Sequence, residues 1–150
     1  MASTIHPFEG GTGCPEPSDL LEITVDQDGG TAIVTARGEI DLYTAPMLSS
    51  ALQEALAGST ELIVVDLSEV TFMASSGLAA LLTGLDEAKR HRCELRLAGG
   101  GRAVQRPLQA AGLGGHFEHY PTATEAVRQR SRGRLSLMIT ARTAPSPDRR

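Results

Sequence analysis

The chain has 150 residues, 41% of them hydrophobic, so it can form one domain with a modest core but is too short for a two-domain enzyme. It contains three Phe, two Tyr and no Trp, too few rings for a surface that stacks the bases of single-stranded nucleic acid. The formal net charge of −4 gives no further reason to expect direct nucleic-acid binding.

Cysteine usage and hydropathy predict a soluble, cytoplasmic protein. Cys14 and Cys93 are too few and too far apart for a disulfide framework or a thiolate metal site, and the histidines show no metal-ligand spacing. The N-terminus lacks the apolar core of a secretory signal, and no apolar run approaches the roughly 18 residues of a membrane span. We therefore expect no metal and no cofactor.

Basic residues are concentrated at the C-terminus. From Arg128 onward the chain carries half of its 14 basic residues, so the preceding part is strongly acidic. Composition predicts a disordered, Gly- and Pro-containing tail over residues 1–18, one domain over residues 19–130, and a basic, flexible tail over residues 131–150. An apolar island at residues 135–139 interrupts the second tail, and the sequence predicts no role for it.

The first half of the domain predicts a β-hairpin followed by a helix. Apolar residues alternate with polar ones over residues 21–25, a Gly-Gly pair supplies a turn, and residues 32–36 continue as the second strand. Thr44 can then cap a helix that has Pro46 in its first turn, where proline is tolerated.

The hydrophobic period changes within residues 61–87. Residues 62–65 are an unbroken, largely β-branched run, which predicts a strand covered on both faces and closed by Asp66. From Leu78 onward leucines recur at spacings of three and four, the pattern of a helix with one buried stripe. The residues expected to be largely buried are Leu62, Ile63, Val64, Val65, Leu78, Leu81 and Leu82.

Shorter periodic segments complete the domain. They predict a strand over residues 94–98, a helix over residues 103–111, a short strand over residues 117–120 and a last helix that ends near residue 130. Strands and helices thus alternate after the hairpin, which predicts an α/β sandwich with right-handed crossovers between parallel strands.

Ser75, Ser76 and Gly77 lie at the predicted strand-to-helix turn, and we expect both serines to be accessible. The hydroxyl of Ser75 can cap the helix by accepting a hydrogen bond from an unpaired N–H group. It can also serve as a phosphoacceptor, because free N–H groups and the positive end of the helix dipole stabilise a phosphate there. The residues alone leave both roles open.

Four motifs together resemble STAS-domain proteins, specifically bacterial anti-sigma factor antagonists. They are GEID followed by TAP at residues 38–46, VDLS with VTF at residues 65–72, SSGL at residues 75–78, and VQRPLQAAGL at residues 104–113. The resemblance extends from about Leu20 to Arg128, nearly the whole predicted domain.

This resemblance implies a STAS-like α/β sandwich, a four- to five-stranded mixed sheet with about four helices on one side. It also implies a regulatory protein, not an enzyme, that works as a monomer or weak dimer. In its unphosphorylated form such a protein binds an anti-sigma factor that is itself an ATP-dependent serine kinase, and so releases a sigma factor. Phosphorylation of Ser75 by that kinase switches binding off, and a phosphatase restores it.

The resemblance also implies which residues surround the phosphorylation site or contact the partner: Asp41, Thr44, Asp66, Ala74, Ser76 and Gly77. Ala74 departs from the family pattern, which usually has Asp before the phosphorylated serine. The departure removes a carboxylate beside the hydroxyl and bears on phosphorylation more than on binding.

Two alternatives remain. Ser75 and Gly77 partly match the G-x-S-x-G elbow of serine hydrolases, but Met73 occupies the other glycine position, and a distant histidine with Asp86 would have to complete a triad. Alternatively, a STAS domain can act as a scaffold or regulatory subunit of a stress-signalling or transport complex. The intact Ser75-Ser76-Gly77 turn favours the phosphorylation switch.

Overall fold

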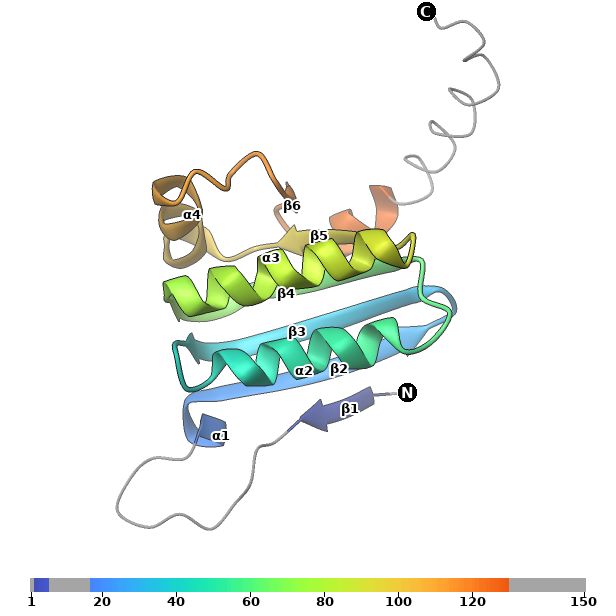
Figure 1. The fold of residues 1–150 in the computed structure, drawn as a ribbon, viewed down its shortest axis with the longest axis horizontal. Coiled ribbons are helices and arrows are strands. Elements are labelled where there is room, and N and C mark those ends of the chain that lie inside the picture. The colour runs from blue at the N-terminus through green and yellow to red at the C-terminus, as the bar shows by residue number, and fades with distance from the viewer. Residues whose placement is uncertain (1, 6–16, 130–150) are drawn as a thin grey trace, which may run out of the picture.

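A computed structural model describes residues 2–5 and 17–129 of the chain (Figure 1). The strands are β1 (Ala2–Ile5), β2 (Leu21–Asp28), β3 (Thr31–Ile40), β4 (Leu62–Met73), β5 (Glu94–Ala98) and β6 (Glu118–Tyr120). The helices are α1 (Pro17–Leu20), α2 (Ala45–Leu56), α3 (Ser75–Arg90) and α4 (Gly101–Ala110), followed by helix 123–129. None of the described helices is both long and apolar enough to cross a membrane.

The six strands form one mixed sheet whose spatial order follows the sequence from β1 to β6. Neighbouring strands are antiparallel from β1 to β3 and parallel from β3 to β6. Helix α2 connects β3 to β4, α3 connects β4 to β5, and the two helices lie side by side over one face of the sheet (Figure 1). The predicted mixed α/β sandwich is therefore confirmed, with β1 as an additional strand.

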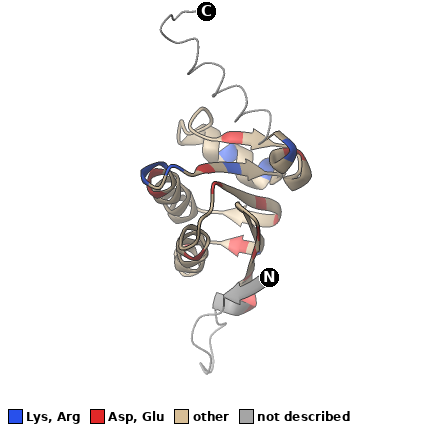
Figure 2. Cartoon of the chain, turned by 90° about the vertical axis from the view of Figure 1, so that its right-hand side faces the viewer, with Lys and Arg blue, Asp and Glu red and all other residues tan. Residues whose placement is uncertain are grey.

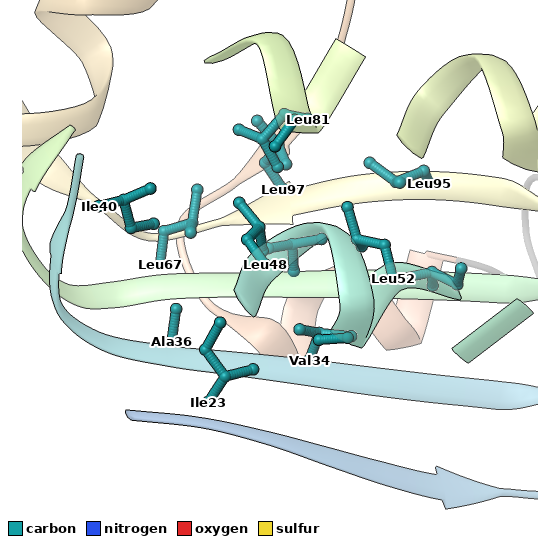
Figure 3. Packing of buried hydrophobic residues seen from close by; sticks show 14 of the residues in the cluster. Ile23, Val34, Ala36, Ile40, Leu48, Leu52, Leu67, Leu81, Leu95 and Leu97 are labelled. Atoms are coloured by element: carbon teal, nitrogen blue, oxygen red, sulfur yellow. The ribbon is translucent and has the colours of Figure 1, made fainter. Parts of the chain in front are cut away.

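The main core fills the space between the sheet and helices α2 and α3 (Figure 3). Alternate strand residues point into it because successive side chains of a strand face opposite sides of the sheet. Gly84 lets the helices approach each other closely, since a Cβ at this position would lie 2.6 Å from Leu52 Cδ1. Side chains at the centre of this core are Ile23, Val34, Leu48, Leu52, Leu67, Leu81 and Leu97.

Strand β4 is buried on both faces at its start, as the sequence predicts, and residues 62–65 are fully buried. Leu62 and Val64 face away from the main core and pack in a second cluster with Ala98 and Ala126. Because Ala126 belongs to helix 123–129, this helix covers the opposite face of the sheet, whereas we expected the helices on one side. Of the other residues predicted to be buried, Leu78 and Leu81 are buried and Leu82 is partly buried.

A buried arginine fastens helix 123–129 to the sheet. Arg96 is 3% exposed, and its Nη1 donates a hydrogen bond to the Ala126 carbonyl oxygen at 2.7 Å. Its Nη2 donates to Glu94 Oε1 at 2.9 Å, and its Nε lies 3.2 Å from Glu118 Oε1. The guanidinium also lies 5.4 Å from the centre of the Tyr120 ring. These partners compensate a cation that would otherwise be costly to bury.

Strands β3 and β4 are longer than the sequence predicts. Asp66 was expected to close the central strand, but β4 continues to Met73. β3 continues to Ile40, and the parallel ladder pairs Ile40 with Met73. The extension of β4 was not predicted because the polar side chains of Asp66 and Ser68 interrupt the apolar run. They do not interrupt the hydrogen-bonded backbone ladder.

The predicted N-terminal tail contains regular structure. β1 pairs with β2 in an antiparallel ladder from Ala2 opposite Asp26 to Ile5 opposite Ile23, and α1 directly precedes β2. β1 is only four residues long and its sequence, ASTI, does not alternate apolar with polar residues, so it does not stand out beside the Gly- and Pro-containing stretch that follows it. Residues 6–16 and the predicted C-terminal tail lie outside the described residues.

We predict that Leu81→Ala lowers the free energy of unfolding by about 2–5 kcal/mol, because Leu81 is fully buried between α3 and the sheet. Chemical denaturation of the variant and the parent protein measures this difference. Leu42→Ala is the control, since Leu42 is 70% exposed and its truncation leaves no cavity. Equal stability of Leu81→Ala and the parent would contradict the packing of α3.

Candidate functional site

The carboxyl ends of β3 and β4 meet the first turn of α3 at one edge of the sheet, on the left in Figure 1. A backbone hydrogen bond from Ala74 N to the Ile40 carbonyl oxygen, 2.8 Å long, joins the two chain segments. Ser75 is the first residue of α3 and is exposed. The edge therefore presents Ser75 beside the turn that leads from β3 into α2.

Gly77 allows the first turn of α3 to sit directly on the strand ends. A Cβ at this position would lie 2.7 Å from Ile40 Cγ2 and would also overlap Met73 Sδ. Such distances are shorter than van der Waals contact, so a larger residue would force the Ile40 and Met73 side chains or the helix itself to shift. Gly77, which the family resemblance implies to lie near the expected phosphorylation site, thus has a packing role.

Ala74, not Ser75, occupies the N-cap position of α3. Its backbone is extended, with φ −90° and ψ 171°, and it makes no side-chain capping bond. The Ala74 carbonyl oxygen accepts hydrogen bonds from Gly77 N and Leu78 N. The N–H groups of Ser75 and Ser76 precede these donors in the first turn, where helix N–H groups have no carbonyl partner within the helix. Capping by Ser75 is therefore excluded, and the helix end retains N–H groups that an anion could engage.

The two serines differ in accessibility, although the sequence predicts both to be accessible. Ser75 is exposed, whereas Ser76 is half-buried. The Ser76 Oγ itself is buried, and it has no hydrogen-bond partner among the described residues. Of these two serines, Ser75 is therefore the one that another protein can reach.

A polar network holds the turn between β3 and α2. Asp41 Oδ1 accepts hydrogen bonds from Tyr43 N at 2.9 Å and Thr44 N at 3.0 Å. Thr44 is fully buried, and its Oγ1 accepts from Asp41 N at 2.8 Å and donates to the Glu39 carbonyl oxygen at 2.9 Å. Thr44 stands at the N-cap position of α2, as predicted, but its hydroxyl makes no capping bond. Asp41 and Thr44 therefore fix the shape of this turn.

Asp66 is not part of this edge. Its Oδ1 accepts hydrogen bonds from Ser68 N at 3.1 Å and Ser68 Oγ at 2.7 Å. It precedes Met73 by seven residues along β4, which corresponds to about 23 Å of strand. It also lies on the same strand face as Leu62 and Val64, opposite α3. The motif that suggested its proximity to Ser75 reflects neighbours in sequence, not in space.

Three large apolar side chains are exposed at the edge that carries Ser75. Leu42 is 70% exposed, Tyr43 is 73% exposed and Phe72 is 50% exposed, and these are the exposed large hydrophobic residues of the described chain. All three lie within three residues of the Ala74–Ile40 hydrogen bond. We call them the apolar rim. The apolar rim was not predicted from the sequence, although large apolar residues in a predicted loop were a signal that could have identified it.

The described residues do not assemble a hydrolase triad or a metal site. Asp86 pairs with Arg90 at 3.4 Å and lies about three turns, or roughly 16 Å, further along α3 than Ser75. The ring Nε2 of His119 lies 2.6 Å from the Gly99 carbonyl oxygen on another loop. No group of three or more His, Cys, Asp or Glu residues within residues 2–5 and 17–129 could hold a metal ion.

Comparison with known proteins identifies the family. The STAS domain family model matches residues 22–126. The anti-sigma-F factor antagonist RsfB of Mycobacterium tuberculosis is 32% identical over 117 residues, which cover 78% of this chain and 95% of RsfB.

Solved structures agree with this match. An anti-sigma factor antagonist from Mycobacterium paratuberculosis superposes with a TM-score of 0.66 at 32% identity, covering 72% of this chain and 92% of its own. SpoIIAA from Bacillus, in its unphosphorylated form, superposes with a TM-score of 0.64 at 23% identity, covering 74% of this chain and 96% of its own, and supports the fold alone. This chain belongs to the STAS-domain family, among relatives that are anti-sigma factor antagonists.

Proposed function

We propose that this protein is an anti-sigma factor antagonist controlled by phosphorylation of Ser75. The observation that carries the proposal is the exposed Ser75 at the first position of α3, bordered by the apolar rim. RsfB, which is 32% identical, supports an anti-sigma factor as the partner.

In this proposal the apolar rim forms the centre of the binding surface. Aromatic side chains are enriched in interface centres, where they bury a large area and lose little conformational entropy. Tyr43 lies in the turn held by Asp41 and Thr44, and Phe72 lies in β4 opposite Glu39 of β3. Both rings are thus attached to ordered backbone, which reduces the entropy lost on binding.

Phosphorylation would then act at the interface and not on the fold. The partner, proposed to be a serine kinase as well as an anti-sigma factor, transfers the γ-phosphoryl group of ATP to Ser75 Oγ, and a phosphatase later removes it. The phosphate adds about −1.5 to −2 charge, which the free N–H groups of the first turn can stabilise within the domain. A partner surface that receives a neutral hydroxyl would have to desolvate this charge. A cost of about 3–4 kcal/mol would weaken binding several-hundred-fold.

We predict that Ser75→Ala binds the anti-sigma factor as tightly as the unphosphorylated protein but accepts no phosphate. Ser75→Glu should bind more weakly while its thermal unfolding remains unchanged, since the carboxylate adds charge at an exposed position. Calorimetric titration with the partner, captured from native cells and identified by mass spectrometry, measures the affinities.

The matched control for Ser75 is its neighbour. Ser76→Ala should still be phosphorylated, because the Ser76 hydroxyl is buried. Phosphopeptide mapping after incubation with partner and ATP locates the modified residue. Phosphate on Ser76, Ser68 or Thr71 would refute the site, and equal affinities of Ser75→Glu and the parent protein would refute the charge mechanism. Binding without any phosphate transfer would favour a scaffold role.

Tyr43→Ala and Phe72→Ala should each weaken partner binding at least about tenfold, the loss typical of a buried aromatic contact. Both should leave the circular dichroism spectrum unchanged, because these side chains are exposed in the free protein. Thr83→Ala, at an exposed position in the middle of α3, serves as the control that should not affect binding. Unchanged affinity of both aromatic variants would place the interface elsewhere.

Ala74→Asp should raise the free energy of unfolding by about 0.5–2 kcal/mol, because a carboxylate at the N-cap can accept hydrogen bonds from first-turn N–H groups. Ala74→Asn separates capping from charge. If neither variant is more stable than the parent protein beyond the experimental error, the N-cap assignment of Ala74 is incorrect. Ala74→Asp also restores the residue that is usual in the family. The rate of phosphate incorporation into this variant therefore reports how the absence of the Asp affects phosphorylation of Ser75.

A further inference from the structure

The face of the sheet opposite α2 and α3 is covered over β4 and β5 but open over β2 and β3. Helix 123–129 buries Leu62, Val64 and Ala98 on this face. Ile33, on the neighbouring strand β3, packs against the same cluster but is only half-buried. Among the described residues, no element continues the cover beyond helix 123–129 toward the β2–β3 hairpin.

A groove follows the border between this helix and the hairpin. One hollow of about 470 Å³ is bounded by Asp26, Asp28, Ile33 and Val127. A second, of about 400 Å³, is bounded by Ile33, Val127 and Arg128, with Ala123 at its wall. Ile33 and Val127 line both hollows, so we treat the two as one feature, the hairpin groove. Its floor is aliphatic and it has room for more than one side chain.

The hairpin side of this groove is acidic. Asp26 and Asp28 lie on the open face of β2, and neither forms an ion pair with another described residue. Figure 2 views the molecule from the hairpin end, where acidic residues lie on the lower and the upper strands, whereas basic residues gather in the upper half. A cationic segment with aliphatic side chains would complement both the floor and the rim of the groove.

The chain itself supplies such a segment. The described residues end at 129, within the helix that forms one wall of the groove. Arg130, Arg132 and Arg134 follow, and then the apolar island at residues 135–139, which contains two Leu, one Met and one Ile. The five residues between the helix and the island can span about 17 Å, so the island can reach the groove.

We propose that residues 135–139 bind in the hairpin groove, with the preceding arginines beside Asp26 and Asp28. The segment then completes the second face of the sheet and covers Ile33 and Val127. This role does not depend on the proposed function, because Ile33 in the groove precedes Ile40, at the edge that carries Ser75, by seven residues of β3, about 23 Å along the strand.

Disulfide trapping in the full chain tests the placement. Cys14→Ser is introduced first, and Ile33→Cys is then combined in turn with Leu135→Cys, Leu137→Cys or Ile139→Cys. The variants are incubated in a glutathione redox buffer. At least one Ile33→Cys pair should form an intrachain disulfide about tenfold faster than the same tail cysteine paired with Leu82→Cys. The reason is that docking raises the effective concentration of the tail cysteine near position 33. Leu82 is the matched control, since it lines a separate hollow on α3.

Equal rates for the Ile33 and Leu82 pairs would overturn the proposal. Disulfides that form only between chains would also overturn it, in favour of a second copy at the groove.

Hydrogen exchange of the full chain gives a second readout that requires no cysteine. Leu137→Asp should accelerate amide exchange in residues 31–35 and 123–129 on the order of tenfold, because local protection depends on the cover. Asp26→Lys combined with Asp28→Lys should have the same effect through charge repulsion. Ser146→Asp is the control in the same tail. Unchanged exchange in both groove variants would overturn the proposal.

Discussion

The close contact between the first turn of α3 and the ends of β3 and β4 is the constraint on which the candidate site depends. It exists because Gly77 has no side chain to separate the helix from Ile40 and Met73. In the same helical turn the hydroxyl of Ser76 is buried, whereas Ser75 is exposed at the adjacent position. The two neighbouring serines therefore differ in their access to another protein.

The surroundings of Ser75 combine rigidity with exposed apolar area. The Asp41–Thr44 network fixes the turn between β3 and α2, and that turn carries Leu42 and Tyr43 outward. Polar groups here are used to shape the backbone, while the large apolar side chains remain free for contact. This division of roles suits a protein that works by binding, since the surface is ordered before the partner arrives.

Hydrophobic period predicted the central strand and helix because burial acts on residues close in sequence. Residues 62–65 are buried on both faces, and the leucine stripe of α3 faces the core, as expected. Features that depend on distant partners were not predictable in this way. Asp66 was associated with Ser75 by motif order, although seven residues of extended strand separate it from the strand end. The sequence of helix 123–129 likewise does not indicate which face of the sheet the helix covers, because its contacts there are with distant residues such as Arg96 and Leu62.

The sequential order of the strands has a consequence for biosynthesis. Because each strand pairs with the one before it in the chain, the sheet can grow one strand at a time as the polypeptide leaves the ribosome, without waiting for distant segments. Helix 123–129 is synthesised after the six described strands, so Leu62 and Val64 lack their cover until it emerges. A nascent chain halted after β5 would therefore carry an exposed apolar sheet face that chaperones could recognise, and synthesis of helix 123–129 would end that exposure.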